Sequence, residues 1–207
     1  MDIANFALFF AAALAIAISP GPGLLYVTAR TLAGGRNEGL ASSFGTGLGG
    51  LVHVAAGAIS VSALVLASAE AYAVLKIAGA LYLVCLGYKS FRESAIAIDA
   101  KVTATGAMRA FREGIVVEAL NPKTAAFFLA FLPQFVAPAE PLVPQLVLLG
   151  SVCVALNTLV DVIAVFATDR LLRSGAARAA RARLMTRASG VTMLGLAAYL
   201  ALARREG

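Results

Sequence analysis

The sequence is poor in charge and in the residues from which catalytic and metal sites are usually built. Only 14% of its 207 residues are charged, against about 25% in an average soluble domain, and 60% are hydrophobic. One histidine cannot form a His-based catalytic metal site, and HExxH and GxSxG motifs are both missing. The two cysteines, Cys85 and Cys153, fall inside apolar stretches, which argues against a disulfide framework. These absences predict an integral membrane protein that is not an enzyme and uses no cofactor or metal.

Long apolar stretches predict an all-α membrane domain with six spans. No Lys or Arg precedes the first stretch, so we expect a retained span rather than a secretory signal. The links between spans are short, which predicts a single transporter domain over residues 1–207. The expected spans are residues 4–29, 42–68, 71–90, 112–136, 143–168 and 188–203.

The basic residues predict the orientation of the chain in the membrane. Thirteen of the 17 Lys and Arg residues fall in links on one side of the predicted spans, which should face the cytoplasm. Six spans then place both termini in the periplasm of a bacterial inner membrane. The net charge of +6 is explained by this clustering, so we expect no nucleic-acid partner. The thirteen are Arg30, Arg36, Lys89, Arg92, Lys101, Arg109, Arg112, Arg170, Arg173, Arg178, Arg181, Arg183 and Arg187.

Two helix-breaking motifs interrupt the first and fourth predicted spans at the same depth. Residues 19–23 read Ser-Pro-Gly-Pro-Gly, and residues 121–123 read Asn-Pro-Lys. Each motif's first proline is ten residues from a basic flank, or roughly 15 Å along a helix, which is about half of a hydrocarbon core. Such irregular backbone is tolerated only where it is buried in protein or lines a cavity. A proline kink that serves packing alone is the simpler interpretation, but the two breaks together are typical of a transporter's substrate site.

The two halves of the sequence resemble each other. Lys76, Gly79 and Tyr88 in the third span have the same spacing as Arg187, Gly190 and Tyr199 in the sixth. Because each half holds an odd number of spans, the halves must be inverted relative to one another. The sequence therefore predicts two inverted three-helix repeats, about 1–92 and about 109–207, with helices 1 and 4 broken and alternating access around a central site.

The ionisable residues inside the predicted spans are the strongest candidates for function, because each costs about 2.5–3.5 kcal/mol to insert. Asp161 lies roughly 13 Å from the basic flank, and Asn157 lies one turn before it on the same face. Lys123 lies at a comparable depth on the fourth span. A Lys123–Asp161 pair would neutralise both charges, either as an ion pair that only fixes helix packing or as a site for a zwitterion or a proton.

His53 and Glu118 are two further candidates for a proton pathway. The pKa range of histidine suits a proton relay, but a hydrogen-bonded histidine that serves helix packing is an equal alternative. Glu118 is only six residues from Arg112, so it is either a solvated charge near the interface or a proton-coupling residue. Glycines around His53 should let neighbouring helices approach closely. These are Gly45, Gly47, Gly49, Gly50 and Gly57.

Several motifs taken together resemble those of the lysine-exporter superfamily, and most closely its homoserine/threonine-exporter (RhtB-type) branch. They are residues 19–23, the glycine-rich span around His53, residues 79–87 from Gly-Ala-Leu-Tyr-Leu to Leu-Gly, residues 121–123 followed by Phe-Leu-Pro-Gln-Phe at 131–135, and Asp161. The resemblance covers nearly the whole chain. It implies a bacterial inner-membrane exporter of amino acids or their derivatives that is driven by the proton-motive force.

The sequence thus predicts a secondary transporter of amino acids, with His53, Asp161 or Glu118 as the proton-coupling group. Near-zero charge in the cavity favours neutral substrates such as threonine, homoserine or leucine. Export of basic amino acids or cations, a passive channel and an intramembrane enzyme are the alternatives. Small residues on several spans also permit a homodimer within the lipid bilayer. The predicted substrate site comprises Ser19, Pro20, Gly21, Pro22, Gly23, Asn121, Pro122, Lys123, Asn157 and Asp161.

Overall fold

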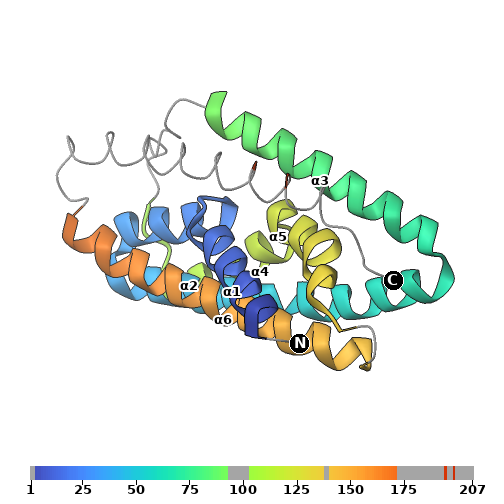
Figure 1. Cartoon of the computed structure of the whole chain (residues 1–207). Coiled ribbons are helices and arrows are strands. Elements are labelled where there is room, and N and C mark those ends of the chain that lie inside the picture. The colour runs from blue at the N-terminus through green and yellow to red at the C-terminus, as the bar shows by residue number, and fades with distance from the viewer. Residues whose placement is uncertain (1–2, 93–102, 138–139, 172–193, 195–197, 199–207) are drawn as a thin grey trace.

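The computed structural model describes residues 3–92, 103–137, 140–171, 194 and 198, and the described part is helical with no strand. Figure 1 shows a bundle of antiparallel and crossing helices. Two described helices are long and apolar enough to cross a membrane, and one bent pair would add a third span. The arginines from 173 to 187 and all of the sixth predicted span, 188–203, apart from residues 194 and 198, lie outside the described residues.

The first predicted span is broken where the sequence predicts. Helix α1 (Ile3–Ile18) and helix α2 (Pro22–Ala67) are separated by three non-helical residues, Ser19, Pro20 and Gly21. A proline has no N–H and its ring clashes with the preceding turn, so the helix cannot run through this point. The fourth span is interrupted in the same way between α4 (Ala107–Ala119) and α5 (Pro122–Ala126).

Helix α2 consists of two helical pieces that meet at Gly35. Gly35 has φ of 73°, a left-handed conformation that favours glycine, and the chain reverses there (Figure 1). The first piece corresponds to the end of the first predicted span, and the second piece corresponds to the second predicted span. The prediction of a link over residues 30–41 is therefore wrong for most of that stretch, because both pieces remain helical up to a single glycine.

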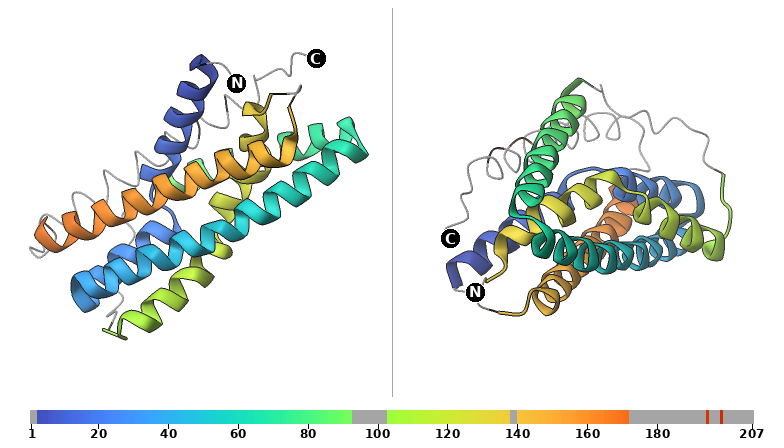
Figure 2. Two further views of the ribbon diagram at one scale, coloured as in Figure 1. Left: turned by 90° about the horizontal axis from the view of Figure 1, so that it is seen from below. Right: turned by 90° about the vertical axis from the view of Figure 1, so that its right-hand side faces the viewer.

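The second piece of α2 lies between α4 and α6 (Leu142–Leu171), as the two views of Figure 2 show. Gly45 and Gly49 face backbone carbonyls of α4, whereas Gly47 and Gly50 face side chains of α6. A Cβ at Gly45 would collide with the carbonyl of Phe111. The predicted close approach of helices at these glycines is confirmed, and it brings α2 into contact with both of the helices that carry buried acids.

The rest of the fourth span follows α5 as a bent, irregular helix. A π-helical turn, η1 (Phe127–Phe131), leads into a 3₁₀ turn, η2 (Leu132–Phe135), and helix α3 (Ala69–Arg92) packs against η1. Aromatic rings form a continuous cluster here, with centroids 5.1–5.5 Å apart between successive members. We call it the aromatic cluster; its members are Phe9, Phe127, Phe131 and Phe135.

The opposite end of the bundle is held by charged side chains. Arg30 donates to Glu113 at 2.6 Å and to Thr105 at 2.9 Å. Glu38 accepts hydrogen bonds from the backbone N–H groups of Thr105 and Gly106 at 2.8 and 2.6 Å. We call this set the ionic network; it joins both pieces of α2 to α4 and to the segment before α4. Glu38 and Glu113 were not among the predicted site residues, because Glu38 falls in the predicted link over residues 30–41 and Glu113 lies at the predicted start of the fourth span, beside Arg112.

Candidate functional site

A small polar cavity lies between the two helix breaks, with the aromatic cluster towards one end and the ionic network towards the other. It encloses about 20 Å³, room for about one water molecule. Five of the predicted functional residues line it: Glu118, Asn121, Lys123, Asn157 and Asp161. The other lining residues are Ala17, Leu24, Thr46, Gly47, Gly50, Thr124 and Val154.

Lys123 is buried and bound to the first helix break rather than to an acid. Its ammonium nitrogen lies 3.0 Å from the carbonyl oxygen of Ile16 and 2.7 Å from that of Ser19, and it donates to both. In an unbroken helix the Ile16 carbonyl would accept from the N–H of residue 20, which is a proline. Lys123 therefore supplies the hydrogen bond that Pro20 cannot make.

The predicted Lys123–Asp161 ion pair is not formed. Among the described residues, ion pairs are formed by Arg30, Arg36 and Arg109, and none joins Lys123 to Asp161. Both groups do line the same cavity. Depth along the helices placed them level with each other, but the carbonyls freed by the first break are the closer partners for the ammonium.

His53 supplies the matching hydrogen bond at the second break. Its Nε2 lies 2.7 Å from the carbonyl oxygen of Glu118, so this nitrogen carries the proton and donates. The Glu118 carbonyl lacks the usual helical donor because residue 122 is a proline, and it also accepts from the N–H of Asn121 at 2.9 Å. His53 is buried and packs near Phe128 at a ring distance of 5.9 Å, and it does not line the cavity. This geometry matches the alternative of a hydrogen-bonded histidine that serves helix packing.

The His53 bond makes a testable prediction, because glutamine can donate to a carbonyl but cannot titrate near neutral pH. We expect His53→Gln to fold and to retain its transport activity and pH dependence. His53→Leu should lose about 1 kcal/mol of stability, since the buried Glu118 carbonyl loses its side-chain donor but keeps the N–H of Asn121. Thermal unfolding and transport of both variants check this. A loss of pH dependence in a stable His53→Gln protein would instead assign His53 to a proton pathway.

The Glu118 side chain is buried between the breaks. Its carboxylate accepts from Asn121 Nδ2 at 2.9 Å and from the hydroxyl of Thr124 at 2.6 Å. The backbone of Gly23 lies so close that a Cβ there would overlap Glu118 Oε2. The alternative of a solvated charge near the interface is wrong, because α4 begins at Ala107 and carries Glu118 to the middle of the bundle.

Asp161 is held by Thr46 of the neighbouring helix α2. Asp161 Oδ2 lies 2.8 Å from Thr46 Oγ1, and the same hydroxyl lies 2.8 Å from the carbonyl of Ser43. A hydroxyl has only one hydrogen to donate. When the Thr46 hydroxyl donates to the Ser43 carbonyl, only a protonated Asp161 can form the hydrogen bond with Thr46, by donating to its oxygen. The two distances at this hydroxyl are therefore compatible with Asp161 in either its protonated or its ionised form.

The residues of the two breaks shape the site mainly through their backbone. Asn121 caps α5, since its side-chain oxygen accepts from the N–H of Lys123 at 3.1 Å. Gly21 leaves room for the Lys123 ammonium, because a Cβ there would come within 2.9 Å of it. Residues 19–23 do not themselves line the cavity, whereas Ala17 and Leu24 on either side of them do.

A charged cavity enclosed between broken apolar helices is the arrangement with which membrane transporters hold a solute. The fold and the site together define a transport protein of the membrane. The chain belongs to the LysE type translocator family, whose model matches residues 14–204. It is therefore a transporter and not an enzyme.

Characterised relatives of this chain are efflux proteins. A homoserine/homoserine lactone efflux protein of Salmonella typhimurium is 33% identical over 70% of this chain and 71% of its own length. A leucine efflux protein of Salmonella choleraesuis is 24% identical over 67% of this chain and 66% of its own length. A membrane protein of Vibrio cholerae with no assigned function is 30% identical over 77% of this chain and 78% of its own. No solved structure matches the chain.

Proposed function

We propose that this LysE-family transporter exports amino acids or close derivatives in exchange for protons, and that the cavity between the helix breaks is its substrate site. The observation that carries the proposal is the charge inventory of the cavity: one cation, Lys123, and two acids, Glu118 and Asp161. With both acids ionised the cavity has a charge of −1, and one proton makes it neutral. Because a net charge is costly in a buried cavity, we expect the cavity to bind one proton when no substrate is present.

The named relatives support a small amine as the substrate. Homoserine, its lactone and leucine share a primary amino group and have uncharged side chains. The lactone has no free carboxylate, so the amino group is the charged feature that all three have in common. We therefore propose neutral amino acids and their derivatives as substrates, and basic amino acids or other cations as the second candidates within the same family.

Alternating access fits the way in which the cavity is enclosed. The aromatic cluster closes one end of the bundle, and the ionic network closes the other. The lysine and histidine bonds support two inverted repeats, because the carbonyl freed at each break is bound by a side chain from the other half of the chain. We propose six spans, including residues 188–203, with the ionic network facing the cytoplasm and both termini in the periplasm of a bacterial inner membrane.

The outer surface of the bundle supports a position within lipid. Large apolar side chains on α2 and α6, such as Phe44 and Leu148, are more than half exposed in the isolated chain. Lipid would cover them, or a second copy would do so in a homodimer.

Transport by the purified protein tests the proposal. Proteoliposomes would be offered labelled homoserine, threonine, leucine and lysine, with and without an imposed pH gradient. We expect uptake of at least one neutral amino acid to increase at least fivefold with the gradient. Flux of the same size without the gradient would indicate a passive channel, and no flux of any of the four would reject the amino-acid assignment.

A further inference from the structure

We propose that the Lys123 ammonium occupies the binding place of the substrate's amino group, and that an entering amine displaces it towards Asp161. The inference rests on the proposed function, which it deepens by naming the group that is recognised. It assigns recognition to the carbonyls of Ile16 and Ser19 and makes Lys123 a tethered competitor for them.

The two carbonyls form a site for a primary ammonium. Lys123 places its terminal nitrogen 3.0 and 2.7 Å from them, within ordinary hydrogen-bond distance. The α-ammonium of an amino acid has the same three N–H donors and the same charge. Gly21 contributes by leaving the space beside the ammonium free of a Cβ. Whatever fits the lysine terminus at this break therefore also fits the amino end of a substrate.

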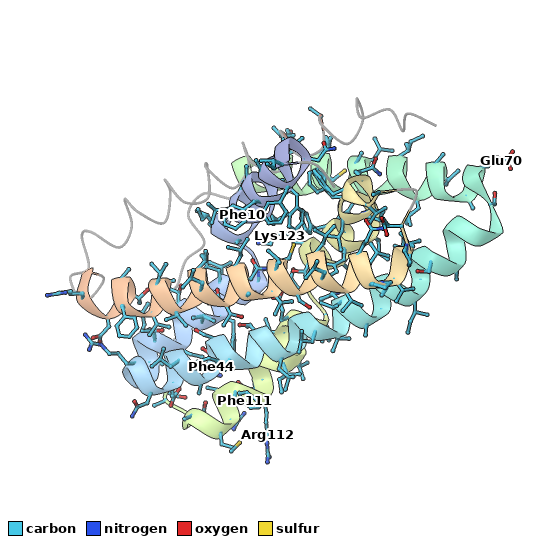
Figure 3. All side chains as sticks on the ribbon, turned by 60° about the horizontal axis from the view of Figure 1, so that its bottom comes forward. Phe10, Phe44, Glu70, Phe111, Arg112 and Lys123 are labelled. Atoms are coloured by element: carbon cyan, nitrogen blue, oxygen red, sulfur yellow. The ribbon has the colours of Figure 1, made fainter. Side chains whose placement is uncertain are left out.

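The size of the cavity requires that something move before a substrate can enter. About 20 Å³ holds roughly one water molecule, far less than an amino acid needs. Lys123 is the lining residue best able to move, since a flexible four-carbon chain carries its charge. Figure 3 shows Lys123 within the bundle, whereas Arg112 of α4 extends away from it.

The displaced lysine has an acid to meet. Asp161 interacts electrostatically with Lys123 and Glu118, which line the same cavity, and its hydrogen-bond partner is the Thr46 hydroxyl. As the ammonium of Lys123 reaches Asp161, the carboxylic acid releases its proton and becomes a carboxylate. One positive charge enters with the amine as one leaves with the proton, so the charge of the cavity is unchanged for an amine that lacks a carboxylate. Substrate binding and proton release become a single exchange.

Three small molecules test whether the amino group or the carboxylate of the substrate displaces Lys123 in the wild-type protein. Leucinamide has the amine without the carboxylate, N-acetyl-leucine has the carboxylate without the amine, and leucine has both. Each would be added to purified protein in weakly buffered detergent, and released protons would be read with a pH indicator. We expect leucinamide and leucine to release about one proton per molecule bound, and N-acetyl-leucine to release at least fivefold less. Equal release by N-acetyl-leucine, or none by leucinamide, would overturn the inference.

Lys123→Gln tests whether proton release depends on movement of the Lys123 charge to the Asp161 carboxylate. The amide of Lys123→Gln still has N–H donors for the broken helix, but it has no charge to move to Asp161. We expect its proton release on binding leucinamide to fall at least fivefold. In the wild type, amine affinity should rise by up to about tenfold per pH unit, and in the variant it should be nearly independent of pH. Arg112→Gln is the matched control, since it removes a positive charge from an exposed position outside the cavity, and it should behave as wild type.

The outcomes distinguish this inference from the proposed function. Gradient-driven transport with undiminished proton release in Lys123→Gln leaves the transporter assignment intact and rejects the role of the lysine. A wild-type protein that neither binds nor transports any of the amines rejects both. If Lys123→Gln does not fold, the three probes on the wild type decide alone.

Discussion

Asp161→Asn is expected to reduce gradient-driven amino-acid uptake by at least about tenfold, and exchange of substrate for substrate should fall with it. An asparagine amide can donate to Thr46 as a protonated carboxyl does, so the hydrogen bonds at the α2–α6 contact survive. The side chain can no longer release a proton, which fixes the site in its protonated form. Uptake and counterflow in proteoliposomes measure the two activities separately.

Asp169→Asn is the matched control for this substitution. It lies two turns further along α6, in an ion pair with Arg36 at 2.6 Å at the end of the bundle. We expect gradient-driven uptake within about twofold of wild type, because such a partly exposed pair contributes little on its own. Full gradient-driven accumulation by a well-folded Asp161→Asn protein would remove Asp161 from the proton pathway.

Gly45→Ala is expected to destabilise the protein by about 2–3 kcal/mol, a large effect for one methyl group. The new Cβ would collide with the carbonyl of Phe111, and a backbone atom cannot rotate away as a side chain could. Helices α2 and α4 would have to separate. Because α4 carries Glu118 and α2 carries Thr46, the cavity should be disturbed as well, and transport should fall with stability.

Gly57→Ala makes the same chemical change on the same helix at a position with room for it. A Cβ there would lie 3.5 Å from the ring of Phe128, an ordinary contact. Thermal unfolding of the two variants should therefore differ by several degrees, with Gly57→Ala close to wild type. Equal stability of the two would contradict the close packing of α2 against α4.

The sequence was sufficient to locate the two helix breaks and five of the residues that line the cavity. Prolines and basic flanks fix positions along a helix axis, so the depth of residues 19–23 and 121–123 could be counted. The same counting placed Asn157 and Asp161 level with the breaks, and both line the cavity. Glycines near residue 50 predicted close helix contacts, which the structure confirms at Gly45 and Gly49.

The partners of the buried charges could not be predicted, because depth does not say which way a side chain faces around the helix. Lys123 was paired with the acid at its own level, whereas the structure gives it two backbone carbonyls. One signal was available: the residue four before each proline must lose its helical donor, which marks Ile16 and Glu118. These two carbonyls need N–H donors from elsewhere in the bundle, and Lys123 and His53 provide them.

Glu118 and the first link were misjudged for a related reason. The depth of Glu118 was counted from Arg112, as if that arginine marked the membrane surface, but α4 begins five residues earlier, at Ala107. The turn between the first two spans was spread over twelve residues, although one glycine with positive φ is enough to make it. Both errors came from taking basic residues as the ends of helices.

Simultaneous measurement of amino-acid and proton flux in one preparation tests the central claim most directly. Proteoliposomes would hold a trapped pH indicator and receive a labelled neutral amino acid that the protein transports. The account predicts proton movement opposite to the amino acid, in a constant ratio, that disappears in Asp161→Asn. Amino-acid flux with no accompanying proton movement in the wild-type protein would contradict it.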